Sequence, residues 1–187
     1  MLPTTQFAYR KSMGNCDALL FMSHTLQNAL ESGQEARIVQ IEFSAAFDRV
    51  NHQGILYKLC SVGIGVSVLS ILTQFLSNRS QQVMVDGCRS KLVNVVLGVP
   101  QGRVLGPLLF LPYTSELFCI LENRLIGYAD DSTLMAIVPS PGVRVAVAES
   151  LICDLGRVRQ DYDSLEVSHN ASPVTPIDYW RNCAEGV

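Results

Sequence analysis

Asp130 and Asp131 are the residues of this chain whose type and spacing point most directly to chemistry. The two adjacent carboxylates follow an apolar run at 125–128 and precede a second apolar run at 132–138. This pattern predicts a strand, a tight turn and a second strand, with both acids at the turn. Carboxylate oxygens suit Mg²⁺, and paired acids at a hairpin tip fit metal-assisted phosphoryl transfer. Aspartate is also common at turns because it bonds its own backbone there, so the pair alone leaves both interpretations open.

Two further segments carry residues that could act together with the acidic turn. Residues 40–52 have the sequence QIEFSAAFDRVNH and contain Glu42 and Phe47. Residues 98–110 have the sequence GVPQGRVLGPLLF and contain Gln101 and Gly102. Each has a structural alternative, because an aromatic residue at the edge of an element is commonly part of the core and a glycine commonly serves a turn.

The elements that position these residues predict a mixed α+β fold, with helices on one face of an antiparallel sheet. Helices are predicted at 17–31, 53–62, 66–76, 104–120 and 141–160, and Pro112 should kink or break the fourth. Strands are predicted at 36–43, 81–85, 91–96, 125–128 and 132–138, the first of them buried. Residues 44–51 form a turn or short helix, in which Asp48 is a cap or a surface acid.

The composition describes one domain, or a large part of one, with ample material for a core. Of the 187 residues, 48% are hydrophobic and 17% are charged, and the net charge of −3 gives no global basic signature for nucleic acid. The six cysteines form no C-x-x-C motif and are expected to be buried free thiols, and the three histidines lack metal-ligand spacing. No signal peptide and no apolar run of membrane-spanning length is visible. We therefore predict an intracellular location, in the nucleus or cytoplasm, with no secretion and no membrane partner.

In their order and spacing, residues 40–52, residues 98–110 and the acidic turn resemble the palm of a reverse transcriptase from a non-LTR, LINE-like retrotransposon. Residues 6–11 and 17–20 also resemble the fingers entry of that family, and the likeness covers roughly residues 3–158. The resemblance implies a right-hand polymerase palm with partial fingers and no thumb. The chain is then a lead-in at 1–14, a fingers and palm fragment at 15–160 and an irregular tail at 161–187.

The resemblance also implies an RNA-directed DNA polymerase that works by two-metal nucleotidyl transfer. Glu42, Asp130 and Asp131 occupy the catalytic and metal-ligand positions, so their carboxylates should converge on two Mg²⁺ ions, with Mn²⁺ as an alternative. The implied partners are an RNA template, a DNA primer and dNTPs. The oligomeric state stays open.

Four residues match the substrate-binding positions of the same family. Phe47 matches the aromatic residue that crowds the ribose 2′ position and selects deoxynucleotides. Gln101 and Gly102 match the loop that packs against the incoming nucleotide and the template base, and Arg103 follows them directly.

Three positions depart from the family pattern. Glu42 stands in place of an aspartate, which moves the carboxylate by about 1 Å and can cost roughly a hundredfold in rate. Arg103 replaces a small residue and either grips phosphate or blocks the pocket. Pro112 replaces a helical leucine or similar residue, at a cost of about 3 kcal/mol.

The resemblance ends after about Arg159, without the family's thumb or endonuclease domain. Two interpretations follow from these departures. The chain is either a polymerase impaired by Glu42 and the missing thumb, or an inactive retrotransposon remnant that is at most a weak metal- or nucleic-acid-binding module. The sequence leaves open whether it is an active enzyme.

Overall fold

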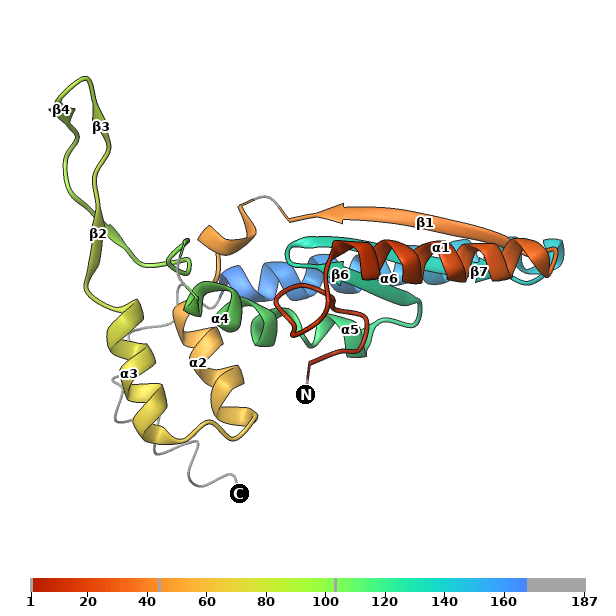
Figure 1. Ribbon diagram of the computed structural model, residues 1–187, viewed down its shortest axis with the longest axis horizontal. Coiled ribbons are helices and arrows are strands. Elements are labelled where there is room, and N and C mark those ends of the chain that lie inside the picture. Colours follow the sequence, from red (N-terminus) through yellow and green to blue (C-terminus); the bar gives the residue numbers. More distant parts are fainter. Residues whose placement is uncertain (1, 44, 103, 168–187) are drawn as a thin grey trace. The chain divides into compact units, whose positions relative to one another are not determined.

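The structure is a computed structural model that describes residues 2–43, 45–102 and 104–167, with side chains up to residue 161 (Figure 1). The chain divides into two compact units. The first contains Met1–Ala46 and Thr114–Ser164, and the second is built around Phe47–Tyr113. The acids predicted to bind metal lie in the first unit, whereas Phe47, Gln101 and Gly102 of the predicted nucleotide-binding set lie in the second.

A three-stranded antiparallel sheet forms the centre of the first unit. Its strand order is β1-β7-β6, with β1 at Glu35–Glu42, β6 at Arg124–Tyr128 and β7 at Asp131–Val138. The central strand β7 pairs with β1 along its whole length, and it joins β6 through the turn that carries the acids. At the outer edge of β6, Gln6 adds an isolated parallel bridge to Gly127. The predicted acidic hairpin is therefore confirmed.

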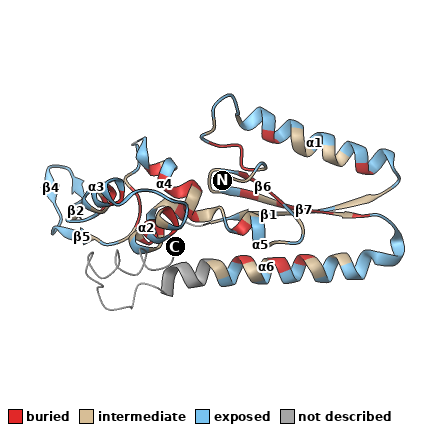
Figure 2. Cartoon of the chain, turned by 90° about the horizontal axis from the view of Figure 1, so that it is seen from below, coloured by how far each residue is buried: buried red, intermediate tan, exposed pale blue. Residues whose placement is uncertain are grey.

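Helices cover both faces of this sheet, so the expectation of helices on one face is wrong (Figure 2). The helix α1 (Asn15–Glu31) covers one face, and α5 (Leu117–Ile120) and α6 (Arg144–Val167) cover the other. Successive side chains of β7 point to opposite faces and supply both cores, since most of its residues are buried. A strand buried on both faces has a nearly continuous apolar run, as β7 does. A short apolar run alone does not show whether helices lie on one face of the sheet or on both.

Each face has its own apolar cluster. The α1 cluster consists of Phe7, Ala18, Ile126 and Met135. The α6 cluster consists of Leu117, Leu125, Leu134, Ala136, Leu151 and Val158. Alternate residues of the same strands enter the two clusters, and this alternation fixes which face each strand residue occupies.

The strand β1 lies where residues 36–43 were predicted to form one, but none of its residues is buried. It is an edge strand, paired only with β7, and only alternate residues face a core. Val39 and Ile41 pack against the α6 cluster, whereas Ile38 is 45% exposed. The prediction of a buried strand was wrong because β-branched residues favour strands at an edge as well as in the interior.

Helices α2 (His52–Ser61), α3 (Val66–Leu76) and α4 (Leu105–Thr114) belong to the second unit, and the first two confirm the predicted pair. Pro112 lies inside α4, and the helix ends two residues later, before α5 begins. A proline removes one helical hydrogen bond and crowds the preceding turn. The break that Pro112 was predicted to cause in the helix at 104–120 is therefore confirmed.

Two short antiparallel ladders complete the second unit, β2 (Arg79–Gln81) with β5 (Val93–Val95) and β3 (Met84–Val85) with β4 (Cys88–Arg89). Asp86 and Gly87 form the turn between β3 and β4, with φ of +49° and +79°. Positive φ at both positions is typical of the hairpin turn that Asp-Gly favours. The predicted hairpin is present, but its ladder is interrupted.

Four other expectations concern the C-terminal part, the cysteines and the helix lengths of the chain. The 3-10 turn η2 (Pro141–Val143) precedes α6, which continues to Val167, beyond the predicted end at 160. Residues 168–187 of the predicted tail lie outside the described residues. The prediction of buried thiols is wrong for the described cysteines. Cys60 is half-buried, and the other four are exposed: Cys16, Cys88, Cys119 and Cys153. No helix in the described ranges is long and apolar enough to cross a membrane.

Candidate active site

The acidic turn is a two-residue hairpin loop formed by Ala129 and Asp130. Tyr128 and Asp131 face each other as the last pair of β6 and β7, so Asp130 lies in the loop and Asp131 begins β7. Ala129 has a φ of +60°. This left-handed conformation costs a residue with a Cβ about 1–2 kcal/mol. Contacts from the surrounding fold are therefore needed to hold the turn in this shape.

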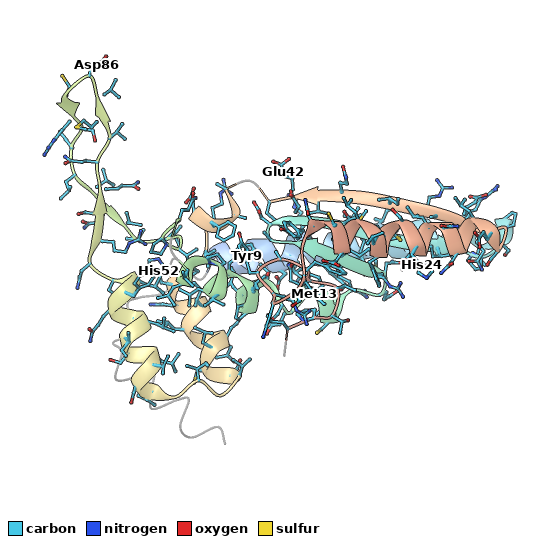
Figure 3. All side chains as sticks on the ribbon, in the orientation of Figure 1. Tyr9, Met13, His24, Glu42, His52 and Asp86 are labelled. Carbon is cyan, nitrogen blue, oxygen red and sulfur yellow. The ribbon has the colours of Figure 1, made fainter. Side chains whose placement is uncertain are left out.

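Glu42 lies directly opposite Asp131, at the carboxyl end of β1 (Figure 3). Directly opposed residues of an antiparallel pair project from the same face, with Cβ atoms about 4.5–5.5 Å apart. Val39 and Ile41 turn toward the α6 cluster, so Glu42 takes the opposite face. Two of the three predicted metal ligands thus share one face at the end of the sheet.

The three acids of this tip have no basic counterpart in the part of the chain that the structure describes. The ion pairs of the described residues include those of Glu35 with Arg37 and Arg144, and of Arg157 with Glu122 and Asp154. Like charges directly opposite one another in a sheet are destabilising, and a bound cation would relieve their repulsion. Within the described ranges, no group of three or more acidic, histidine or cysteine side chains is placed to hold a metal ion. The expected convergence of all three carboxylates is therefore not seen.

Gln6 contacts the turn from the lead-in and was not predicted as a site residue. The Ala129 N–H donates to Gln6 Oε1 at 3.3 Å, and Gln6 Nε2 donates to the Ala129 carbonyl at 3.4 Å. Gln6 is 2% exposed. In the sequence, Gln6 belongs only to the segment that resembles the fingers entry, because no spacing rule relates a residue to a turn that follows 123 residues later.

Tyr9 is a second lead-in residue close to the acidic turn. Burial raises the pKa of the Tyr9 phenol, and the charges of Asp130 and Tyr128 raise it further. Since an ordinary tyrosine already titrates near pH 10, Tyr9 is a neutral phenol at physiological pH. It adds no negative charge to the acidic tip.

The loop at 98–102 is anchored, within the second unit, on the segment that contains Phe47 and Asp48. The Gly98 N–H donates to the Val50 carbonyl at 2.8 Å, and the Val99 N–H donates to the Phe47 carbonyl at 2.9 Å. Gly98 has a φ of +81°, and a Cβ there would lie 2.7 Å from the Asp48 carbonyl oxygen. Only glycine fits this position, which explains the first glycine of the motif.

Two side chains tie the loop further to the same segment. Gln101 Nε2 donates to Asp48 Oδ1 at 2.9 Å, so Asp48 orients the predicted substrate-binding glutamine. His52 Nε2 lies 2.8 Å from the Gly98 carbonyl oxygen. Burial lowers the pKa of His52, and Arg79 lowers it further, against the opposing effect of the bond to Gly98. Asp48 was predicted to be a cap or a surface acid, and its link to a residue 53 positions away left no signal in the sequence.

The remaining predicted substrate residues occupy different surroundings. Phe47 is half-buried and stacks on Phe110, with ring centroids 4.3 Å apart and planes at 23°. Part of its surface thus serves packing. Gly102 is exposed with a φ of +70°. Arg103 lies outside the described residues.

An antiparallel sheet whose hairpin tip carries two aspartates, with a further acid opposite on the adjacent strand, agrees with the palm-like fold that a polymerase family match implies. Residues 1–148 match the family described as reverse transcriptase (RNA-dependent DNA polymerase). The chain belongs to this reverse transcriptase family.

Similar proteins come from non-LTR retrotransposons. Over 161 residues the chain is 30% identical to the RNA-directed DNA polymerase from mobile element jockey of Drosophila funebris. The aligned region covers 86% of this chain and 17% of that protein. Over 142 residues it is 33% identical to the jockey polymerase of Drosophila melanogaster, covering 72% and 15%. Over 143 residues it is 30% identical to the probable RNA-directed DNA polymerase from transposon BS of Drosophila melanogaster, covering 72% and 16%. The LINE-like resemblance is confirmed, and the chain spans about a sixth of these relatives' length.

Proposed function

We propose that the chain is the fingers and palm part, at 15–160, of an RNA-directed DNA polymerase. Its partners would be an RNA template, a DNA primer and dNTPs, and its location would be the nucleus or cytoplasm. In the reaction, the primer 3′-hydroxyl oxygen bonds to the α-phosphorus of a dNTP, the bond to pyrophosphate breaks and the hydroxyl proton is lost. The observation that carries the proposal is Glu42 opposite Asp131 on a chain of the reverse transcriptase family.

Glu42, Asp130 and Asp131 are the residues that would hold two Mg²⁺ ions, or Mn²⁺ in their place. Their donor set fits such ions, because it consists of carboxylate oxygens that no basic residue of the described ranges neutralises. When bound, the ions would activate the 3′-hydroxyl and offset charge on the reacting phosphates. The contribution of the chain itself is to hold two of these carboxylates on one face of a rigid sheet end.

Phe47, Gln101, Gly102 and Arg103 form the proposed nucleotide-binding set. Phe47 would crowd the ribose 2′ position, and its stacking on Phe110 would keep the ring in place. Gln101 would contact the incoming nucleotide and template base, with its amide oriented by Asp48. A side chain held in this way loses less conformational entropy when a substrate binds.

The second candidate is an inactive retrotransposon remnant that is at most a weak metal- or nucleic-acid-binding module. The observation that favours it is Glu42, which replaces the aspartate of the family and carries its carboxylate about 1 Å further from the strand. Under this alternative the fold persists and polymerisation is lost.

Template-directed incorporation by the purified chain tests the proposal. The chain would be incubated with a primed RNA template, labelled dNTPs and either Mg²⁺ or Mn²⁺. We expect slow incorporation that Asp131→Asn abolishes, with Asp86→Asn, an exposed acid at the β3–β4 turn, as the matched control. No incorporation by the parent chain with either metal, together with none by Glu42→Asp, would establish the inactive alternative.

A further inference from the structure

We propose that Gln6 is a positioning residue for the acidic turn. Its side-chain amide fixes the peptide groups around Ala129 and thereby the direction in which Asp130 presents its carboxylate. This inference rests on the proposed function, in which Asp130 is a metal ligand. Gln6 itself touches neither metal nor substrate.

The first observation is a two-point contact from a buried amide. Gln6 accepts a hydrogen bond from the Ala129 N–H and donates one to the Ala129 carbonyl, so both polar groups of that residue are engaged by one side chain. Gln6 Oε1 also accepts the Ala8 N–H at 3.0 Å. A 2% exposed amide with three protein partners has little freedom to rotate. The turn is therefore held by a fixed group and not by solvent.

The second observation is that the backbone of Gln6 is itself fastened to the sheet. The neighbouring Phe7 N–H donates to the Gly127 carbonyl at 2.9 Å, and the Gly127 N–H donates to the Thr5 carbonyl at 2.9 Å. The Arg10 guanidinium donates to the Gln6 carbonyl at 3.1 Å. The lead-in thus acts as a short extra strand at the edge of β6, and Gln6 cannot withdraw from the turn without breaking this pairing.

The third observation is the space that Gly127 leaves for the amide. A Cβ at this position would lie 2.7 Å from Gln6 Nε2 and 2.7 Å from Phe118 Cζ. Gly127 has no positive φ, so its backbone conformation does not require glycine. What requires glycine is the close approach of two side chains, Gln6 and Phe118, of which Gln6 is the one that contacts the turn.

These contacts act on the strained residue of the turn. Ala129, at φ +60°, lacks the conformational freedom of the glycine or asparagine that usually occupies such a position. Without the amide of Gln6, the loop can relax to other turn shapes, and the Asp130 carboxylate then samples several directions. A metal site assembled from Asp130 would bind its ion more weakly, because the ion must then select one of these directions.

The first experiment measures hydrogen exchange of the Ala129 amide in the full chain by NMR. We expect this amide to be protected in the parent chain and to exchange about tenfold faster in Gln6→Met, a variant of similar length without the amide. Ala129 in the parent chain exchanging at the rate of a free turn amide would overturn the proposal. This readout needs no metal and is therefore independent of the proposed function.

The second experiment measures Mn²⁺ affinity by titration of the same chains. Gln6→Met is expected to bind Mn²⁺ about tenfold more weakly, the effect of one net hydrogen bond on an equilibrium. The matched control is Asp154→Asn, which weakens a buried network between α6 and Asn123 in the same unit and does not touch the turn. Asp154→Asn should lower the unfolding midpoint and leave Mn²⁺ affinity unchanged. If Gln6 only stabilised the fold, Gln6→Met would behave like this control and would also leave Mn²⁺ affinity unchanged.

The results distinguish a failure of the proposed metal site from a failure of the positioning role of Gln6. Absence of Mn²⁺ binding by the parent chain overturns the proposed metal site, and Ala129 exchange alone then decides whether Gln6 fixes the turn. Equal Mn²⁺ affinity of the parent and Gln6→Met overturns the positioning role alone. Should Gln6→Met fail to fold, Gln6→Asn keeps an amide but shortens the side chain by one methylene, so that it no longer reaches Ala129, and unchanged Ala129 exchange in that variant would refute the proposal.

Discussion

Replacing Glu42 with aspartate is expected to raise nucleotide incorporation by about a hundredfold. Glu42 is the last residue of β1 and lies opposite Asp131, so both backbones are fixed by the sheet. The change withdraws the carboxylate by one methylene, about 1 Å, toward the position that an aspartate occupies in the family. A misplacement of this size costs roughly a hundredfold in rate, which corresponds to about 2.7 kcal/mol in the activation free energy.

The same substitution should leave the free energy of unfolding unchanged within about 0.5 kcal/mol, because exposed residues outside special contacts contribute little. Glu42 is exposed, and no ion pair in the described ranges involves it. An increase in incorporation at constant stability would therefore report on the site and not on the fraction of folded chain.

The assay is primer extension under single-turnover conditions with Mg²⁺, on chains whose urea unfolding has been measured. Glu35→Asp is the matched control, since it makes the same change at the other end of β1, where Glu35 faces Val138 and pairs with Arg144. We expect a gain for Glu42→Asp and none for Glu35→Asp. Equal incorporation by the parent and Glu42→Asp, or an equal gain in both variants, would refute the reasoning.

Three further perturbations test the surroundings of the site by urea unfolding. Gly98→Ala should destabilise the chain by about 1–3 kcal/mol more than Gly102→Ala, because both have positive φ but only the first Cβ meets facing backbone, at 2.7 Å; equal costs would contradict the close approach. Burial lowers the pKa of His52 below its ordinary value of about 6.5, so the unfolded chain binds more protons in acid and the free energy of unfolding should fall below that pH. His52→Gln should flatten this dependence, and an unchanged profile would exclude His52 as its source. Asp154→Ala should cost about 2–3 kcal/mol, because the buried carboxylate accepts the Asn123 N–H at 2.8 Å, and a loss under 0.5 kcal/mol would contradict this.

The hairpin, the paired helices α2 and α3 and the break after α4 could be predicted because their signals are local. Two apolar runs around Asp130 and Asp131 define the hairpin, and Gly63-Ile64-Gly65 separates the two helices. Pro112 acts through its own ring within one turn. In each case the deciding interaction lies within a few residues of the signal, so reading a single segment suffices.

The layer arrangement and the supporting contacts could not be predicted in this way. Gln6 and Ala129 are 123 residues apart, and Asp48 and Gln101 are 53 apart. A hydrogen bond between distant residues leaves no periodicity, and a glutamine in a lead-in has the same local pattern whether or not it reaches a turn. The family resemblance named the site acids and the loop glutamine but carried no information on what holds them.

The pairing of Glu42 with Asp131 follows from apolar residues and not from the acids themselves. Val39 and Ile41 enter the α6 cluster, and a slip of β1 by one residue along β7 would turn both away from it. The core thus fixes the register, so the residue that follows Ile41 lies opposite Asp131 whatever its type. Glu42 is exposed, so an aspartate or a glutamate there leaves the core untouched. If Glu42 is a catalytic ligand as proposed, stability and catalysis depend on different residues of the same strand, and Glu42→Asp should change the incorporation rate without changing the free energy of unfolding.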